Sequence, residues 1–151
     1  MRDKRFVAQH RGGPLTREQH RQLMRWACDC AGHVLPLLGD TVDVRLGNAL
    51  EVAKAWRQGN ASVGDARKAA VAAHAVARAS SNPTAVAVAR SVGHAVATAH
   101  MADHALGAAW YALKAAKSAG GSAETERTWQ DDQLPSGIKE LVLTARTHTN
   151  I

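Results

Sequence analysis

The sequence is poor in aromatic residues and contains no long apolar run. Aromatics make up 4% of the 151 residues, so the interior must be built mainly from Ala, Val and Leu, and each of the four tryptophans is expected to anchor one packing junction. No stretch of about eighteen residues is both apolar and uncharged, which predicts that no helix spans a membrane. The charged N-terminus lacks the apolar run of a signal peptide, so we expect a cytoplasmic protein.

Cysteine is also scarce, and the two that occur, Cys28 and Cys30, are only two residues apart. On a helix such positions point about 200° apart, so they neither form a disulfide nor share a metal ion. This predicts a reducing compartment. Cys30 shares an apolar stripe with Trp26 and Val34, and a thiol in apolar surroundings is inert even though His33 follows three residues later.

The common catalytic signatures are missing as well. The sequence has no Gly-x-Ser-x-Gly nucleophile turn and no phosphate-binding loop, and Gly12-Gly13 is too short to hold a phosphate. The tract from Ser62 to Gly120 contains no Glu, although the zinc and di-iron sites of helical proteins draw their ligands or bases from Glu. We therefore expect a non-enzymatic protein that uses no cofactor.

That same tract is an alanine-dominated helix former that carries four histidines. His100 and His104 are four residues apart, the spacing at which two imidazoles on one helix face reach the same ion, and Asp103 lies between them. His74 would come from a neighbouring helix, whereas His94 lies about 120° from His100 on an ideal helix and would need a kink to join. A metal-dependent hydrolase that uses His74, His100, Asp103 and His104 is thus one alternative, but we favour a structural or partner-contact role for these histidines.

Capping signals and apolar spacing predict the helices. Helices are expected after Thr16 (with Gln19 completing a capping box), Asp43, Ser62 and Asn82-Pro83, and over residues 124–132 and 136–147. The helix that begins at Pro83 would be about thirty-seven residues long, against a typical eleven or twelve, so we expect a break between Thr98 and Asp103.

No segment alternates apolar and polar residues as a strand does. The sequence therefore predicts an all-α fold, a single antiparallel bundle of six to seven alanine-rich helices joined by short turns. The bundle is expected over residues 15–147, after a basic N-terminal arm over 1–14 and before a C-terminal tail over 148–151. Alanine covers little apolar area, so such helices are stable only when they pack closely.

The net charge of +6 is concentrated at the N-terminus, where residues 1–25 hold seven Lys or Arg against two acids. Arg17, Arg21 and Arg25 recur every four residues and so share one exposed face. With Arg2, Lys4, Arg5 and Arg11 they form a basic strip, and DNA binding through this strip is a second alternative. A solvated, frayed N-terminus explains the same composition without a partner.

The tryptophans Trp26, Trp56, Trp110 and Trp129 fall at apolar stripe positions, one to a helix, where core anchoring is expected. Trp129 lies in a polar segment and is the one we expect to be partly exposed. Our candidate partner-binding residues are Arg17, Arg21, Arg25 and Trp129. Small-residue helix faces suit contacts within one chain and between chains equally well.

Three segments carry a family resemblance: His20-Arg21-Gln22-Leu23-Met24-Arg25-Trp26-Ala27, the run from Ala69 to Arg78, and the run from Gly93 to Ala105. With Arg57 to Gly59 and the stretch from Trp129 to Pro135, the chain resembles the bacterial "putative immunity protein" family over roughly residues 10–146. That family is an all-helical, immunity-protein-five-like domain associated with polymorphic toxin systems. The resemblance implies a non-enzymatic protein that binds and neutralises a cognate toxin.

One property departs from that pattern. Immunity proteins are often acidic because many of their targets are basic nucleases, whereas this chain has a pI of about 9.9. Three alternatives follow: the target is acidic, the target is not a nuclease, or the resemblance extends to the fold and not to the role.

Overall fold

The computed structural model describes residues 2–149, and within them the chain folds into helices alone, with no strand. The α-helices are α1 (Arg17–Val34), α2 (Val44–Arg57), α3 (Val63–Ala79), α4 (Pro83–Ala97), α5 (His104–Ser118), α6 (Ala123–Asp132) and α7 (Ser136–Thr149), and the 3-10 turns are η1 (Lys4–Phe6), η2 (Gln9–Arg11) and η3 (Leu35–Leu38). An isolated bridge joins Ala8 and Leu15. The predicted all-α class is confirmed. Of the predicted arm and tail, residues 1, 150 and 151 lie outside the described part.

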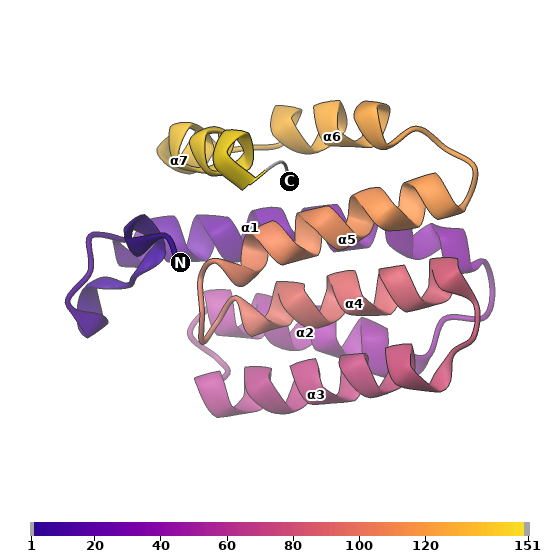
Figure 1. The fold of residues 1–151 in the computed structure, drawn as a ribbon. Coiled ribbons are helices and arrows are strands. Elements are labelled where there is room, and N and C mark those ends of the chain that lie inside the picture. Colours follow the sequence, from indigo (N-terminus) through magenta and orange to yellow (C-terminus); the bar gives the residue numbers. More distant parts are fainter. Residues whose placement is uncertain (1, 150–151) are drawn as a thin grey trace.

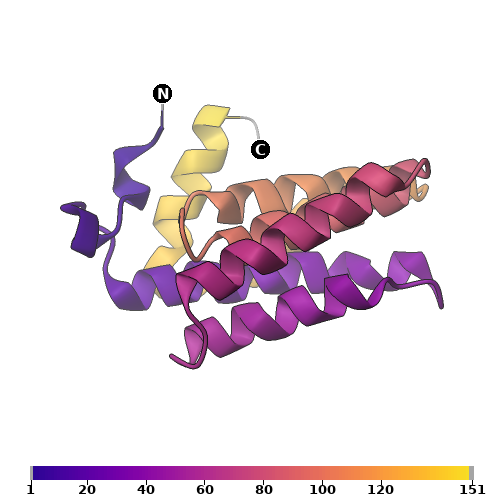
Figure 2. The ribbon, with the colours of Figure 1, turned by 90° about the horizontal axis from the view of Figure 1, so that it is seen from below.

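The helices form two layers. Figure 1 shows α3, α4 and α5 side by side in front of α1 and α2, with α6 beyond α5, and the view from below in Figure 2 shows α7 running across the end of the bundle. Helix α4 is the centre, because it packs against α1, α2, α3 and α5. None of the described helices combines the length and the apolar character that crossing a membrane requires.

The predicted helix starts are confirmed by their hydrogen bonds. The Thr16 hydroxyl accepts from the Gln19 amide at 3.0 Å while the Gln19 side chain accepts from the Thr16 amide at 2.9 Å, a complete capping box. Ser62 and Asp65 make the same pair of bonds at the start of α3. The Asn82 side chain accepts from the Ala85 amide at 3.0 Å at the start of α4.

The predicted break between Thr98 and Asp103 is confirmed. Residues 98–100 bond to carbonyls three residues back, which tightens the last turn of α4 before the chain reverses into α5. The end of a helix leaves carbonyl oxygens without intrahelical partners. Here His20 of α1 satisfies one of them, because its Nε2 lies 2.6 Å from the Thr98 carbonyl oxygen.

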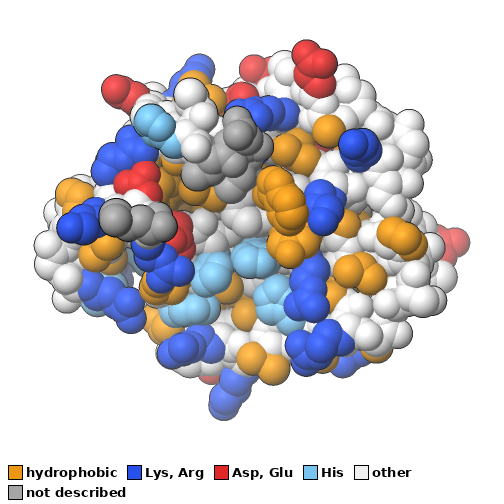
Figure 3. Space-filling model, viewed as in Figure 1, with side chains coloured by type: hydrophobic (Ala, Val, Ile, Leu, Met, Phe, Trp, Pro, Cys, Tyr) orange, Lys and Arg blue, Asp and Glu red, His pale blue; other side chains and the backbone are white. Residues whose placement is uncertain are grey.

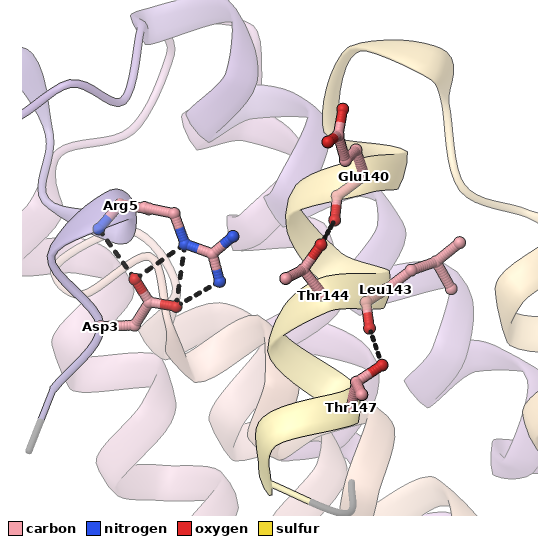
Figure 4. A network of polar contacts seen from close by, with 6 residues as sticks. All are labelled: Asp3, Arg5, Glu140, Leu143, Thr144 and Thr147. Carbon is pink, nitrogen blue, oxygen red and sulfur yellow. Dashed lines mark hydrogen bonds and ion pairs between the residues drawn. The ribbon is translucent and has the colours of Figure 1, made fainter.

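Of the alternative of a solvated, frayed N-terminus, the fraying is wrong because the segment folds onto the bundle, whereas Arg2, Lys4 and Arg11 are exposed. Phe6 is buried in the main core. Asp3 and Arg5 form an ion pair with a closest distance of 2.6 Å, and Figure 4 shows this pair opposite α7.

On α7, the Thr144 and Thr147 hydroxyls donate to the carbonyls four residues earlier, at Glu140 and Leu143.

Most residues of the predicted apolar stripes are buried. The stripe of α1 is buried throughout, as are Ile138, Val142 and Ala145 of α7. Trp110, predicted as a core anchor, is 36% exposed, and its ring contacts are with Tyr111 and Lys114 of its own helix. Trp26 is fully buried, and Trp56 is half-buried.

A buried arginine joins the last two helices to the body. Arg146 of α7 has no exposed surface, and its guanidinium donates to Asp131 at 2.6 Å and to the side-chain oxygen of Gln130, both on α6. It also lies 5.2 Å from the centre of the Trp26 ring on α1, within cation–π range. Gln130 extends the network. Its backbone carbonyl accepts from the Trp26 indole at 2.8 Å, and its side-chain amide donates to the backbone carbonyl of Ala109 on α5 at 3.0 Å.

We expect Arg146→Ala to lower the free energy of unfolding by roughly 3–5 kcal/mol, because it leaves a cavity and strips a buried polar network of its cation. Urea unfolding followed by circular dichroism measures the change. The matched control is Lys139→Ala, an exposed site on the same helix, where a change within about 0.5 kcal/mol is expected. Equal losses in the two variants would contradict the role given to the network.

Candidate functional site

Four histidines form a continuous row across α3, α4, the α4–α5 turn and α5. In spatial order they are His74, His94, His104 and His100, and we call them the histidine row. Neighbouring ring centroids are 5.4, 5.2 and 5.1 Å apart along it. The Nδ1 atoms of His94 and His104 lie 3.2 Å apart, so that one ring donates to the other. Figure 3 shows histidine side chains gathered near the middle of the face that α3, α4 and α5 present.

The predicted geometry of these histidines is wrong for His100 and His104, whereas His94 joins them through the break that the sequence predicted. His100 and His104 do not share one helix face, because His100 lies in the turn between the helices and His104 is the first residue of α5. His94, which an unbroken helix would direct away from them, joins the row because the chain reverses between it and His104.

Glycines on the neighbouring helices make room for two of the rings. A Cβ added at Gly93 of α4 would lie 2.7 Å from the His74 ring of α3, and one added at Gly107 of α5 would lie 2.6 Å from Nδ1 of His94. Each ring thus lies directly on the backbone of the next helix. Helix-interior glycines in an alanine-rich sequence are the signal from which this packing could have been inferred, because glycine lowers helix stability and is retained where space is needed.

Sequence reasoning also missed the polar and aromatic partners of the row. Arg90 of α4 donates from Nη1 to Nδ1 of His74 at 2.8 Å, which places the His74 proton on Nε2. Tyr111 of α5 stacks on His94, with centroids 5.2 Å apart and planes 24° apart. The Nδ1 atom of His100 is buried and has no hydrogen-bond partner among the described residues.

Burial favours the neutral form of each ring in the row. Burial, with His104, His74 and Arg90 nearby, lowers the pKa of His94 from 6.5 to about 4. Burial is also the main cause that lowers the pKa of His74, His100 and His104. At His104, the Asp103 carboxylate partly opposes that shift.

The proposed metal ligands do not converge on one point. The Nδ1 lone pair of His74 is taken by Arg90, and Asp103 pairs with Arg2 at 2.7 Å. Within residues 2–149, no group of three or more His, Cys, Asp or Glu side chains is arranged to hold a metal ion. The histidines are brought together, but as a row of ring contacts and not as a coordination shell.

Cations surround the row. Repulsion by the charges of Arg2, Arg11 and Arg67 lowers the pKa of His100. Arg78 and Arg90 lower the pKa of His74 in the same way. The guanidinium groups of Arg2 and Arg11 also contact the sulfur of Met101, at 3.4 and 3.6 Å respectively. One of these five arginines, Arg2, forms an ion pair with Asp103. Among the described residues, the other four form no ion pair; they are Arg11, Arg67, Arg78 and Arg90.

Aromatic and apolar side chains extend the same face. The Lys114 ammonium lies 4.5 Å from the centre of the Trp110 ring and 5.7 Å from that of Tyr111. Val71, one helical turn before His74, is 65% exposed. Figure 3 shows hydrophobic side chains and Lys and Arg side chains next to the histidines. This surface therefore combines Trp, Tyr and Arg, the residue types that contribute most to protein–protein binding.

The predicted arginine face of α1 lies elsewhere. Arg17 and Arg25 are exposed, and Arg21 is half-buried between two open depressions of the surface. Both depressions are shallow, and the one beside Arg25 is also lined by the acids Glu18 and Asp29. The arginines thus line adjoining depressions, but Arg21 is only partly exposed and acids are interspersed.

Trp129 is half-buried, and its ring stacks on His33 with centroids 3.5 Å apart. His33 in turn lies 2.6 Å from the Glu126 carboxylate through Nδ1. These contacts join α1 to α6 and occupy one face of the Trp129 ring, so Trp110, and not Trp129, is the more exposed tryptophan.

Burial favours the protonated, poorly nucleophilic form of both thiols, which agrees with the expectation for Cys30. Burial raises the pKa of the Cys28 thiol to about 12 and that of Cys30 well above its usual value. The two thiols are free.

Comparison with known proteins gives one match. The sequence model of the Imm-5 like putative immunity protein family matches residues 13–137, which include α1 to α6 and the start of α7. No curated protein and no solved structure matches the chain.

We expect Gly93→Ala to lower the free energy of unfolding by about 1–3 kcal/mol, because its Cβ would overlap the His74 ring. Gly47→Ala is the matched control on α2, where nothing lies within 4 Å of the added Cβ, and it should gain up to about 1 kcal/mol from helix propensity. Removing the ring as well, in Gly93→Ala/His74→Ala, should cost less than the sum of the single changes, as urea titrations would measure. If the losses in unfolding free energy of the two single variants simply add in the double variant, the His74 ring does not pack against Gly93 as described.

We expect the folded state to lose stability as pH falls from about 6.5 to about 4. The unfolded chain takes up a proton at His94 near its ordinary pKa of 6.5, whereas the folded chain does so only near a pKa of about 4. The stability that neutral His94 contributes is therefore complete above about pH 7 and is lost as pH falls from about 6.5 to about 4. Urea midpoints measured between pH 7.5 and 4.5 follow this loss. His94→Gln should flatten the profile and His148→Gln, at an exposed site, should leave it unchanged. A wild-type midpoint that is the same at pH 7 and pH 5 would contradict this prediction.

Proposed function

Because the chain belongs to the Imm-5 like putative immunity protein family, we propose that it is a non-enzymatic protein that neutralises a cognate bacterial toxin by binding to it directly. The observation that carries this proposal is the extent of the family match, which spans residues 13–137 and so takes in nearly the whole helical body.

The surface chemistry supports a binding role. The histidine row and its neighbours bring rings, guanidinium groups and exposed apolar side chains together on one face, and such mixtures supply most of the binding energy at protein interfaces. Inert buried thiols and neutral imidazoles that contact one another suit packing and hydrogen bonding. Free cysteines also agree with the proposed site of action, the cytoplasm of the cell that the protein protects.

Blocking the toxin's active surface requires a contact region on this chain. The sequence-based candidates, Arg17, Arg21 and Arg25 with Trp129, remain one proposed region. Their side chains would steer an acidic partner toward α1 by long-range attraction. Trp129 would add little, because His33 already covers one face of its ring.

The test is protection. Each open reading frame beside the gene is expressed in a bacterial host, with and without this chain, and colony counts are compared. We expect one neighbouring product to be toxic alone and harmless when the wild-type chain is present. The two purified proteins should also form a complex in size-exclusion chromatography, with a dissociation constant measurable by calorimetry.

Two outcomes would overturn the proposal. One is that no neighbouring product is toxic, or that the chain protects against none of them. The other is that freshly purified protein carries a stoichiometric Zn, Fe or Mn ion and hydrolyses a substrate, because this would favour the metal-dependent alternative over binding alone.

A further inference from the structure

The face formed by α3, α4 and α5 carries a positive charge that its own acids do not balance. Arg67, Arg78 and Arg90 lie on it without a carboxylate partner among residues 2–149, and Lys114 lies over aromatic rings and not beside an acid. Asp103 is already engaged by Arg2. A ligand that supplies carboxylates would therefore meet several unpaired cations at once, whereas a cation would be repelled.

The histidine row between these cations offers hydrogen-bond donors as well. The Nε2–H of His74 is free to donate, because Arg90 occupies the other nitrogen of that ring. His100 has a buried Nδ1 without a partner among the described residues. A neutral imidazole donates one hydrogen bond to a carboxylate, and on taking up a proton it donates two and carries a charge.

Apolar anchors lie on both sides of the row. Trp110 and Tyr111 pack edge to face on α5, with centroids 4.9 Å apart, and Val71 is exposed on α3. A nucleic acid offers phosphates along a strand but no side chains to bury on such anchors, whereas an acidic protein segment offers both carboxylates and apolar side chains.

From this charge complementarity we propose that the histidine row and its arginine border form the docking surface for an acidic segment of a protein partner, whose carboxylates lie along the row. The proposal rests on the proposed function, since it takes that segment to belong to the neutralised toxin. It differs from the sequence-based expectation, which places the contact on α1.

Binding at this surface is linked to protons. The groups that face the row are Arg2, Arg11, Arg67, Arg78, Arg90, Lys114, Tyr111 and, as the acid, Asp103. All but the last two are cations, and the five arginines combine with burial to favour the neutral form of the free row. Carboxylates brought by a partner favour the imidazolium form, so the bound row takes up protons and affinity rises as pH falls from about 7.5 to about 5.5.

A partner-independent experiment uses a synthetic dodecaglutamate peptide. Histidine ring signals of the full chain are assigned by NMR with single His→Gln variants and followed as the peptide is added. We expect the four row histidines to shift and their titration midpoints to rise, while His33, already paired with Glu126, and His148 on α7 stay in place. If none of the row histidines shifts, or if all eight histidines shift alike, the proposal is wrong.

Matched charge reversals locate the surface. Arg67→Glu/Arg78→Glu changes two exposed arginines on α3, and Lys54→Glu/Lys139→Glu makes the same change of charge at exposed lysines on α2 and α7, outside both proposed contact regions. The α3 variant should abolish the peptide-induced shifts and weaken binding to the toxin by about tenfold or more, because like charges would then face each other. The control variant Lys54→Glu/Lys139→Glu should stay within about threefold of the wild type once ionic strength is raised enough to screen long-range effects.

The outcomes separate this inference from the proposed function. Protection by the wild type together with undiminished protection by the α3 variant would overturn the docking surface and leave the immunity function standing. If the wild type protects against no toxin but still binds the peptide along the row, the immunity function is overturned and the acidic-segment docking surface stands. A twelve-base-pair DNA duplex that shifts the row more strongly than the peptide, at equal charge, would replace the acidic protein segment with a nucleic acid and so overturn the proposal.

Discussion

The structure depends on how closely α3, α4 and α5 approach one another. Alanine contributes little buried area, so a core made of it gains stability only when backbones come close enough for many small contacts. Gly93 and Gly107 permit that approach at the two places where a bulky imidazole lies between helices. The Ser91 hydroxyl, which donates to the Ala108 carbonyl at 2.7 Å, shows the same closeness, because a side chain so short reaches the next backbone. The histidine row is a result of this packing, since each ring is aligned by the helix beneath it.

Most of the fold was predictable from local signals. The capping residues Thr16, Ser62 and Asn82 specify helix starts through hydrogen bonds that span three residues, and such bonds need no tertiary information. The break after Thr98 followed from length alone. What escaped prediction was the exposure of Trp110, since an apolar residue at a helical stripe position is buried only if another helix covers that stripe. The burial of Arg146 escaped for a similar reason, because it depends on partners from α1 and α6.

The candidate site was predictable in its residue types and not in its arrangement. The four histidines stand out in an alanine-rich tract, but the sequence left open whether they are packing elements or a site. Their geometry was not, because ring contacts between His74 and His94, or between His94 and His104, require knowing which helices are adjacent and in what register. A single helix face for His100 and His104 is what the metal-site alternative requires, whereas the turn between the helices produces a row. The contribution of Arg90 and Tyr111 is likewise a property of the assembled bundle.

The C-terminal helices are attached by a guanidinium that lies against an indole, and this has a practical consequence. The emission of Trp26 depends on the dielectric and the charge around its ring, so detachment of α7 would change the fluorescence of a residue more than a hundred positions away in the chain. The protein thus contains its own optical reporter for local opening at that end, distinct from the global melting of the bundle.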